Sequence, residues 1–254
     1  MEKNNLTQAI GIIPVRYDST RLPGKPLIDI CGKSLLQRTW EGVSQSNTLQ
    51  KIIVAIDDER IAELCLNIGA EYIMTPSSLP SGTDRVAYAY NAMEEDFDII
   101  LNIQGDEPFL TGDLIDKLVC SFAESESDVA TLVKKIQTFE ELEDPNIVKV
   151  VLDSDNNAMY FSRSPIPYIR DIEKKDWLTN LTFWKHIGVY AYRKNSLFKF
   201  IVLPVSNYEK AERLEQMRLL ETGAKYLCVQ TDADLIGVDT PEDLEKVRSI
   251  LEIK

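Results

Sequence analysis

Residues 10–25 have the sequence IGIIPVRYDSTRLPGK, in which an apolar run passes directly into a polar loop. The run Ile10–Val15 predicts a fully buried strand, because it is short, uninterrupted and followed by turn-forming residues. Pro14 is expected to end the pairing of this strand. Backbone N–H groups and fixed cations together bind polyphosphates, so the loop predicts an anion site, the alternative being solvated charges on an ordinary loop. Its cations and hydroxyl residues are Arg16, Ser19, Thr20, Arg21 and Lys25.

Strands and helices are expected to alternate through the first half of the chain. Apolar runs predict strands at residues 51–56, 71–74 and 98–103, and helical spacing of apolar residues predicts helices from Ser34, from Asp57 to Ile68, and from Ser81 to about Met93. Gly69 is expected to end the second helix as its C-cap. This alternation indicates an α/β fold, Rossmann-like, with a mixed but mostly parallel sheet flanked by helices.

The second half is less regular, and an inserted lobe is expected at about residues 150–210. The charged segment 170–177 is expected to be an exposed loop, and the last helix to begin at Pro241 with Asp239 or Thr240 as its cap. Further strands are predicted at 129–133, 148–152, 159–162, 187–192 and 226–230, and helices at 139–143, 195–202 and 214–221.

Composition excludes several classes of function. A net charge of −13 argues against a nucleic-acid partner, because binding to phosphate backbones needs a basic face. The first strand is not followed by GxGxxG, and Leu27 stands where a P-loop needs its first glycine, so both nucleotide motifs are rejected. The four cysteines are scattered and form no CxxC pair, which argues against structural zinc. With no stretch that approaches a membrane span, a cytoplasmic protein is expected.

Carboxylates near strand and helix ends are the main candidates for chemistry. Asp106 follows a predicted strand, at the edge where α/β sheets bind their ligands. The alternative for a single aspartate at such a position is a turn or cap, and Asp239 has the same alternative. Ser81 or Thr83 could be only a helix N-cap, and the single histidine, His186, could be only a structural residue.

Seven blocks of the sequence resemble, in the same order, those of the cytidylyltransferases that activate 3-deoxy-manno-octulosonate (Kdo). The chain departs from that family at Val15, where an alanine is usual. The two added methyls lie beside the expected base pocket and would change its shape. The blocks are RYDSTRLPGKPL at 16–27, SGTDR at 81–85, NIQGDEP at 102–108, SRSPIP at 162–167, HIGVYAY at 186–192, LEQMR at 214–218 and GVDTPEDL at 237–244.

The resemblance implies a nucleotide-diphospho-sugar transferase fold, with residues 1–254 as one nucleotidyltransferase domain, and the formation of CMP-Kdo for lipopolysaccharide synthesis. Asp106 and Asp239 would hold Mg²⁺, and with Arg16, Arg21 and Lys25 they would form the catalytic set. CTP would contact Pro14, Val15, Arg16, Ser19, Arg21, Lys25, Ser81, Gly82, Thr83, Asp84, Arg85, Gln104 and Asp106. Kdo would contact Gln104, Arg163, His186, Tyr190, Glu215 and Gln216.

The same resemblance implies CTP and Kdo as substrates and a homodimer whose contact, like the sugar site, is shaped by the lobe. Two alternatives remain open. One is a cytidylyltransferase for a related acid, such as 8-amino-Kdo or a sialic acid. The other is a non-catalytic CTP-binding module, which retention of both candidate metal carboxylates disfavours.

Overall fold

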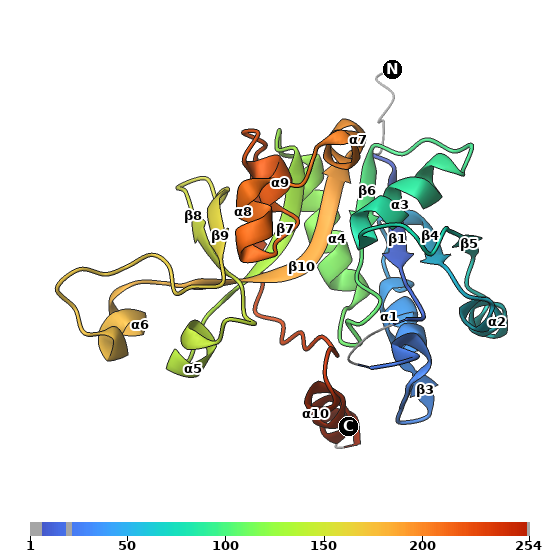
Figure 1. The fold of residues 1–254 in the computed structure, drawn as a ribbon, viewed down its shortest axis with the longest axis horizontal. Helices are drawn as coiled ribbons and strands as arrows, with labels where there is room; N and C mark the ends of the chain where they lie inside the picture. The colour runs from blue at the N-terminus through green and yellow to red at the C-terminus, as the bar shows by residue number, and fades with distance from the viewer. Residues whose placement is uncertain (1–6, 19–21, 253–254) are drawn as a thin grey trace. The chain divides into compact units, whose positions relative to one another are not determined.

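The computed structural model describes residues 7–18 and 22–252, which form two compact units (Figure 1). Unit 1 comprises Met1–Ala123 and Asp234–Lys254, and unit 2 comprises Glu124–Ala233. The chain therefore leaves unit 1 once and returns to it at the C-terminal end. The predicted lobe, residues 150–210, lies within unit 2.

The sheet of unit 1 is parallel and has the buried strand β1 (Ala9–Pro14) in its interior (Figure 1). β1 lies between β4 (Leu49–Ile56) and β6 (Ile99–Asn102), and β5 (Tyr72–Met74) pairs with the other edge of β4. Pro14 is the last residue of β1, as expected, and it is in register with Ala55; one further hydrogen bond follows, in which the N–H of Val15 donates to the Ala55 carbonyl at 2.8 Å. The N–H that proline lacks points away from β4, since successive residues of a strand bond to opposite neighbours.

Capping residues mark the ends of the helices in unit 1. Ser34 caps α1 (Leu35–Val43) by accepting the N–H of Gln37, and Gly69, with φ 75°, ends α2 (Glu59–Ile68) in the left-handed conformation. Asp58 caps α2, so the helix begins two residues later than predicted and leaves Asp57 outside it. The other elements are the 3₁₀ helix η1 (Lys25–Leu27), the hairpin of β2 (Asp29–Ile30) and β3 (Lys33–Ser34), α3 (Gly82–Asn91), α4 (Gly112–Ala123) and α10 (Pro241–Glu252).

An apolar cluster joins the two chain segments of unit 1. Residues 22–35 pack against residues that follow the return of the chain to this unit. Burial of such side chains stabilises the fold by roughly 1.5 to 3 kcal/mol each. The buried members are Leu22, Ile30, Leu35, Val238, Leu244 and Val247.

Unit 2 is built on a mixed sheet. β7 (Val129–Lys135) pairs parallel with β11 (Tyr226–Gln230) and antiparallel with β10 (Trp184–Arg193), and β8 (Lys149–Leu152) pairs with the start of β10 and with β9 (Ala158–Ser162). The β7–β10 register shifts between Ile187 and Tyr190, which marks a β-bulge. Together with the parallel sheet of unit 1, this confirms the predicted α/β class with a mixed, mostly parallel arrangement.

The helices of unit 2 correct two predictions. The helix predicted at 214–221 is only α9 (Met217–Leu220), and α8 (Asn207–Glu212) was not predicted although Ser206 and Glu209 form its capping box. The segment 170–177 is not an exposed loop throughout, because Trp177 is buried against Ile136, Leu142 and Phe183. The other helices are α5 (Phe139–Glu143), η2 (Lys174–Asp176), α6 (Trp177–Asn180) and α7 (Lys194–Val202). None of the helices in residues 7–18 and 22–252 is long and apolar enough to cross a membrane.

Candidate active site

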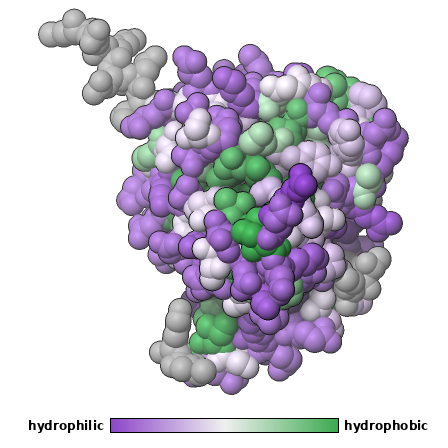
Figure 2. Space-filling model, turned by 90° about the vertical axis from the view of Figure 1, so that its left-hand side faces the viewer, coloured by the Kyte–Doolittle hydropathy of each residue, from purple (hydrophilic) through white to green (hydrophobic). Residues whose placement is uncertain are grey.

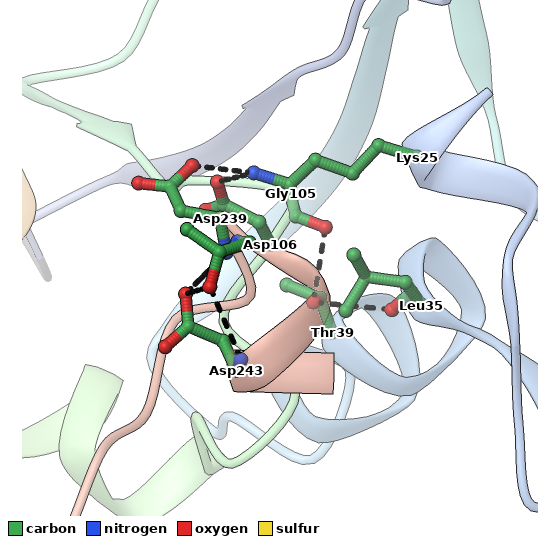
Figure 3. A network of polar contacts seen from close by, with 8 residues as sticks. Lys25, Leu35, Thr39, Gly105, Asp106, Asp239 and Asp243 are labelled. Carbon is green, nitrogen blue, oxygen red and sulfur yellow. Dashed lines mark hydrogen bonds and ion pairs between the residues drawn. The ribbon is translucent and has the colours of Figure 1, made fainter. Parts of the chain in front are cut away.

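Two aspartates from distant parts of the chain meet at one ammonium group in unit 1 (Figure 3). The Nζ of Lys25 lies 2.5 Å from Oδ2 of Asp106 and 2.8 Å from Oδ1 of Asp239. Lys25 is the first residue of η1, Asp106 lies in the loop after β6, and Asp239 precedes α10. The structure thus brings together three of the five predicted catalytic residues around a single cationic point.

Asp239 is not the cap of α10. Thr240 and Asp243 form a reciprocal cap, in which the hydroxyl of Thr240 accepts the N–H of Asp243 at 3.2 Å and a carboxylate oxygen of Asp243 accepts the N–H of Thr240 at 2.9 Å (Figure 3). The capping alternative for Asp239 is therefore wrong, and its carboxylate is directed to Lys25 instead.

The Lys25 ammonium is held in its charged form. Desolvation by burial would lower the pKa of Lys25, but the charges and hydrogen bonds of Asp106 and Asp239 outweigh it and raise the pKa above its ordinary value. The lysine side chain is 13% exposed, whereas that of Asp239 is 54% exposed, so the pair of carboxylates remains open to solvent on one side. A small cation could reach it from that side.

Glu107, the neighbour of Asp106, is a residue that the sequence analysis missed. Its Oε2 atom is buried and has no hydrogen-bond partner among the described residues. Burial raises the pKa of Glu107 to about 8, with further contributions from the charges of Asp106 and Asp239. Three acidic groups therefore share this region, although no group of three or more His, Cys, Asp or Glu within residues 7–18 and 22–252 is arranged to hold a metal ion.

Close packing positions the backbone beside Asp106. A Cβ atom on Gly105 would lie 2.8 Å from Cγ2 of Val15, so only glycine fits against this valine. The buried hydroxyl of Thr39 lies 3.3 Å from both the Gly105 and the Leu35 carbonyls (Figure 3). The extra methyls of Val15 thus occupy the space that Gly105 leaves free.

The loop after β1, residues 15–25, is described only in part. Arg16 is exposed, Pro14 is half-buried and Val15 is buried. Ser19 and Arg21, which the sequence analysis assigned to the CTP site, lie outside the described residues. The N–H of Tyr17 donates to Oδ1 of Asp57 at 2.9 Å, a contact that was not predicted because Asp57 was expected to begin a helix.

The SGTDR block forms the first turn of α3. Ser81 is its N-cap and accepts the N–H of Asp84 at 3.1 Å, as the capping alternative predicted. A Cβ on Gly82 would be at an ordinary contact distance from Pro14, and buried Thr83 accepts a hydrogen bond from Asn102, which also accepts one from Gln104. Arg85 is buried and donates to Thr75 and, at 3.0 Å, to Asp57.

In unit 2, His186, Tyr190 and Gln216 lie together. The rings of His186 and Tyr190 are 5.3 Å apart, and the hydroxyl of Tyr190 donates to Gln216 at 3.1 Å. Nε2 of His186 lies 3.0 Å from the hydroxyl of Thr131, whose hydrogen is directed to the carbonyls of the β10 bulge. The Thr131 oxygen then accepts from His186, which assigns the Nε2–H tautomer, and burial lowers the pKa of His186 to about 3.

Arg163 has backbone partners on three of its nitrogens. Nε donates to the Glu212 carbonyl at 2.8 Å, Nη1 to the Pro145 carbonyl at 2.9 Å and Nη2 to the Arg213 carbonyl at 3.4 Å. The guanidinium therefore connects the end of α8 to the loop before β8. Glu215 is exposed beside the buried Gln216.

Comparison with known proteins gives consistent results. A family model described as Cytidylyltransferase matches residues 10–227. A 3-deoxy-manno-octulosonate cytidylyltransferase of Parabacteroides distasonis is 47% identical over 95% of this chain and 97% of its own length, and one of Porphyromonas gingivalis is 44% identical over 96% and 97%.

Solved structures also resemble this chain. The structure of a CMP:2-keto-3-deoxy-manno-octonic acid synthetase complexed with CTP superposes with a TM-score of 0.90 at 39% identity, covering 97% of this chain and 99% of that one. A 4-diphosphocytidyl-2C-methyl-D-erythritol synthase from Anaerococcus prevotii has a TM-score of 0.65 at 15% identity, over 98% of this chain and all of that one, which is a likeness of fold alone.

Proposed function

The chain belongs to the family of 3-deoxy-manno-octulosonate (Kdo) cytidylyltransferases, and from this premise we propose that it transfers CMP from CTP to the anomeric hydroxyl of Kdo, giving CMP-Kdo and pyrophosphate. The observation that carries the proposal is the convergence of Asp106 and Asp239 on one cation. The same proposal has four further parts: Mg²⁺ as the metal, a homodimer, a cytoplasmic location and a role in lipopolysaccharide biosynthesis.

The residues of this chain mainly position the substrates and neutralise their charge. Both substrates are anions, so their approach needs cations at the triphosphate and a carboxylate partner at the sugar acid. Arg16, Arg21 and Lys25 are the proposed partners of the triphosphate, and Arg163 of the sugar carboxylate. His186, Tyr190, Gln216 and Glu215 would hydrogen-bond the sugar hydroxyls, and Ser19, the SGTDR block and Gln104 would lie along the nucleotide.

The two aspartates suit a hard divalent cation. Cytidylyltransferases generally use a divalent metal, and Mg²⁺ is typically bound by one or two carboxylates together with substrate phosphates and water. Asp106 and Asp239 supply two carboxylates, and the Lys25 ammonium already bridges them in the way a small cation would. When bound there, the metal would polarise phosphate oxygens and stabilise the leaving pyrophosphate.

A pyrophosphate-release assay tests this function. Release from CTP should require a divalent cation and Kdo, and Asp239→Asn should reduce it by at least about a hundredfold, as expected for loss of a group that stabilises transition-state charge. Asp113→Asn, the same change at an exposed position on α4, is the matched control. No release with CTP and Kdo would refute the proposal. A faster reaction with 8-amino-Kdo or a sialic acid would identify that acid as the substrate instead of Kdo.

We also propose that unit 2 carries the contact between two copies of the chain. Large apolar side chains are exposed on this unit, and the face drawn in Figure 2 is mainly hydrophilic with hydrophobic groups near its centre. Tyr160 and Tyr208 pack edge to face at 6.0 Å and join β9 to α8. The exposed residues are Met159, Tyr168, Leu181, Val202, Val205 and Tyr208. Sedimentation should give a dimer that Val202→Glu dissociates, while Leu66→Glu, at an exposed leucine of unit 1, should not.

A further inference from the structure

The ladder between β1 and β4 continues beyond both strands through a side chain. The N–H of Val15 donates to the Ala55 carbonyl at 2.8 Å, and two residues later the N–H of Tyr17 donates to Oδ1 of Asp57 at 2.9 Å. In a parallel ladder the next acceptor for Tyr17 would be a backbone carbonyl two residues beyond Ala55. The carboxylate of Asp57 takes the place of that carbonyl.

This arrangement fixes the backbone of Arg16. Arg16 lies between Val15 and Tyr17, and the N–H groups of both neighbours are held by the β4 end of the sheet. The position of the Arg16 Cα atom is therefore fixed, although the Arg16 side chain is exposed. A cation that leaves the backbone at a fixed point loses less conformational freedom when it binds a ligand.

Asp57 is itself held in place by a buried cation. Its second oxygen, Oδ2, accepts a hydrogen bond from Nη2 of Arg85 at 3.0 Å, and the side chains of Asp57 and Arg85 are 9% and 4% exposed. The Nη1 of Arg85 donates to the hydroxyl of Thr75, which in turn donates to the Ile56 carbonyl at 2.8 Å. A buried, charge-assisted contact of this kind orients the carboxylate firmly.

The ring of Tyr17 contacts residues at both sides of the loop, Arg60 on α2 and Gly24 before Lys25. The Arg60 guanidinium carbon lies 3.3 Å from the centre of this ring, within cation–π range. The Tyr17 hydroxyl lies 3.1 Å from where a Cβ on Gly24 would be, and Gly24 has φ 67° and precedes Lys25. Tyr17 thus contacts the residue next to Lys25 while its backbone is held by Asp57.

We propose that Asp57 is a positioning residue for the triphosphate end of the CTP site, acting through the N–H of Tyr17 and held in turn by Arg85. This inference rests on the proposed function. It also changes the role expected for Arg85, from a group that contacts the nucleotide to one that orients Asp57.

Two variants separate positioning from folding. Asp57→Asn leaves one acceptor for two donors, because its amide nitrogen cannot accept from Tyr17 or Arg85. The double variant Asp57→Ala/Arg85→Met removes both buried charges together, so no unpaired charge remains to unfold the protein. Asp98→Asn is the matched control, since Asp98 is an exposed aspartate whose carboxylate accepts the N–H of Gln8 at 2.9 Å, before β1 rather than after it.

The first readout needs no nucleotide. Amide hydrogen exchange of Tyr17, measured by NMR, should become about tenfold faster or more in both variants, while the amide of Val15 on its backbone acceptor stays protected. Unchanged exchange at Tyr17, or equal acceleration at Val15, would overturn the proposal.

The second readout is CTP affinity by calorimetry without Kdo. The dissociation constant should rise about tenfold in both Asp57 variants and stay unchanged in Asp98→Asn, while the KM for Kdo remains near that of the wild type. Faster exchange at Tyr17 with unchanged CTP affinity would refute positioning. A wild-type protein that bound no CTP would refute the proposed function, and the exchange measurement would still decide whether Asp57 anchors the loop.

Discussion

At the scale of single residues, neighbours decide what each charged group can do. His186 and Lys25 illustrate two opposite cases. His186 is half-buried beside a neutral hydroxyl, and desolvation lowers its pKa to about 3. Lys25 is also largely buried, but two carboxylates hold its charge. The sequence predicted both residues as site candidates, but it could not predict their charge states, because these depend on contacts between distant segments.

We expect His186 to remain neutral from pH 5 to 8. Because the folded pKa of about 3 is below the unfolded value of about 6.5, the histidine contributes fully to stability above pH 6.5, and this contribution is lost as the pH falls toward 3. As the sequence contains one histidine, a single imidazole NMR signal should show the Nε2–H tautomer without titration in this range. A midpoint near 6.5 in the folded protein would contradict this.

We expect a divalent cation to free the Lys25 amine. An ammonium shared by two carboxylates is protected from acylation, and a metal that takes the same carboxylates removes that protection. Mn²⁺ should therefore increase acylation of Lys25 several-fold, as measured by mass spectrometry. Lys33, which pairs with Glu41 at 2.6 Å, is the internal control. Equal or reduced labelling of Lys25 would show that metal and lysine do not compete.

At the scale of elements, the sequence predicted those whose signals are local. Ser34, Gly69 and Pro241 mark helix ends as expected, and the apolar runs mark the strands of unit 1. The capping box at Ser206 was present in the sequence but was overlooked. Burial of Trp177 had no local signal, because the charges around it are those of an exposed segment and only packing against Phe183 and its neighbours reveals it.

Asp116 on α4 holds the connection between α1 and β4. Desolvation would raise the pKa of Asp116, but hydrogen bonds from Ser46, Asn47 and Thr48 outweigh it and lower the pKa to about 2. Asp116→Ala should lower the free energy of unfolding at pH 7 by about 2 kcal/mol, since several donors lose one acceptor.

The effect of this substitution should depend on pH in a defined direction. The folded pKa lies below the unfolded value of about 3.9, so the wild-type contribution is complete above pH 4 and is lost as the pH falls toward 2. Urea unfolding at pH 7, 4 and 3 should show the difference between variant and wild type shrinking at the lowest pH. A constant difference would mean that the hydrogen bonds do not depend on the charge of Asp116.

At the scale of the whole molecule, unit 1 depends on contacts between its two chain segments. The family resemblance indicated that Asp106 and Asp239 act together, but neither periodicity nor spacing indicates which apolar residues bring them together. The cluster of Leu22, Ile30 and Leu35 with Val238, Leu244 and Val247 does so. Glu107 and Asp57 were missed for the same reason, since their significance lies in contacts across this unit.

Leu244→Ala should destabilise both segments of unit 1. Loss of a buried leucine side chain typically costs about 2 to 5 kcal/mol, and Leu244 is 8% exposed. Hydrogen exchange should accelerate in residues 22–35 as well as in α10. Leu66→Ala, at a leucine 69% exposed on α2, should change stability by less than about 0.5 kcal/mol. Acceleration confined to α10 would contradict the coupling.

The divided course of unit 1 has a consequence for the order in which the protein is made on the ribosome. Unit 2 is one continuous segment, Glu124–Ala233, and all of it is synthesised before Asp234 is added. Unit 1 still lacks Asp239 and α10 at that moment. Asp106 and Asp239 therefore cannot meet at Lys25 until the whole of unit 2 and the residues up to Asp239 have been synthesised. A chain that stops within unit 2 retains Lys25 and Asp106 without Asp239, so we expect such a fragment to be inactive.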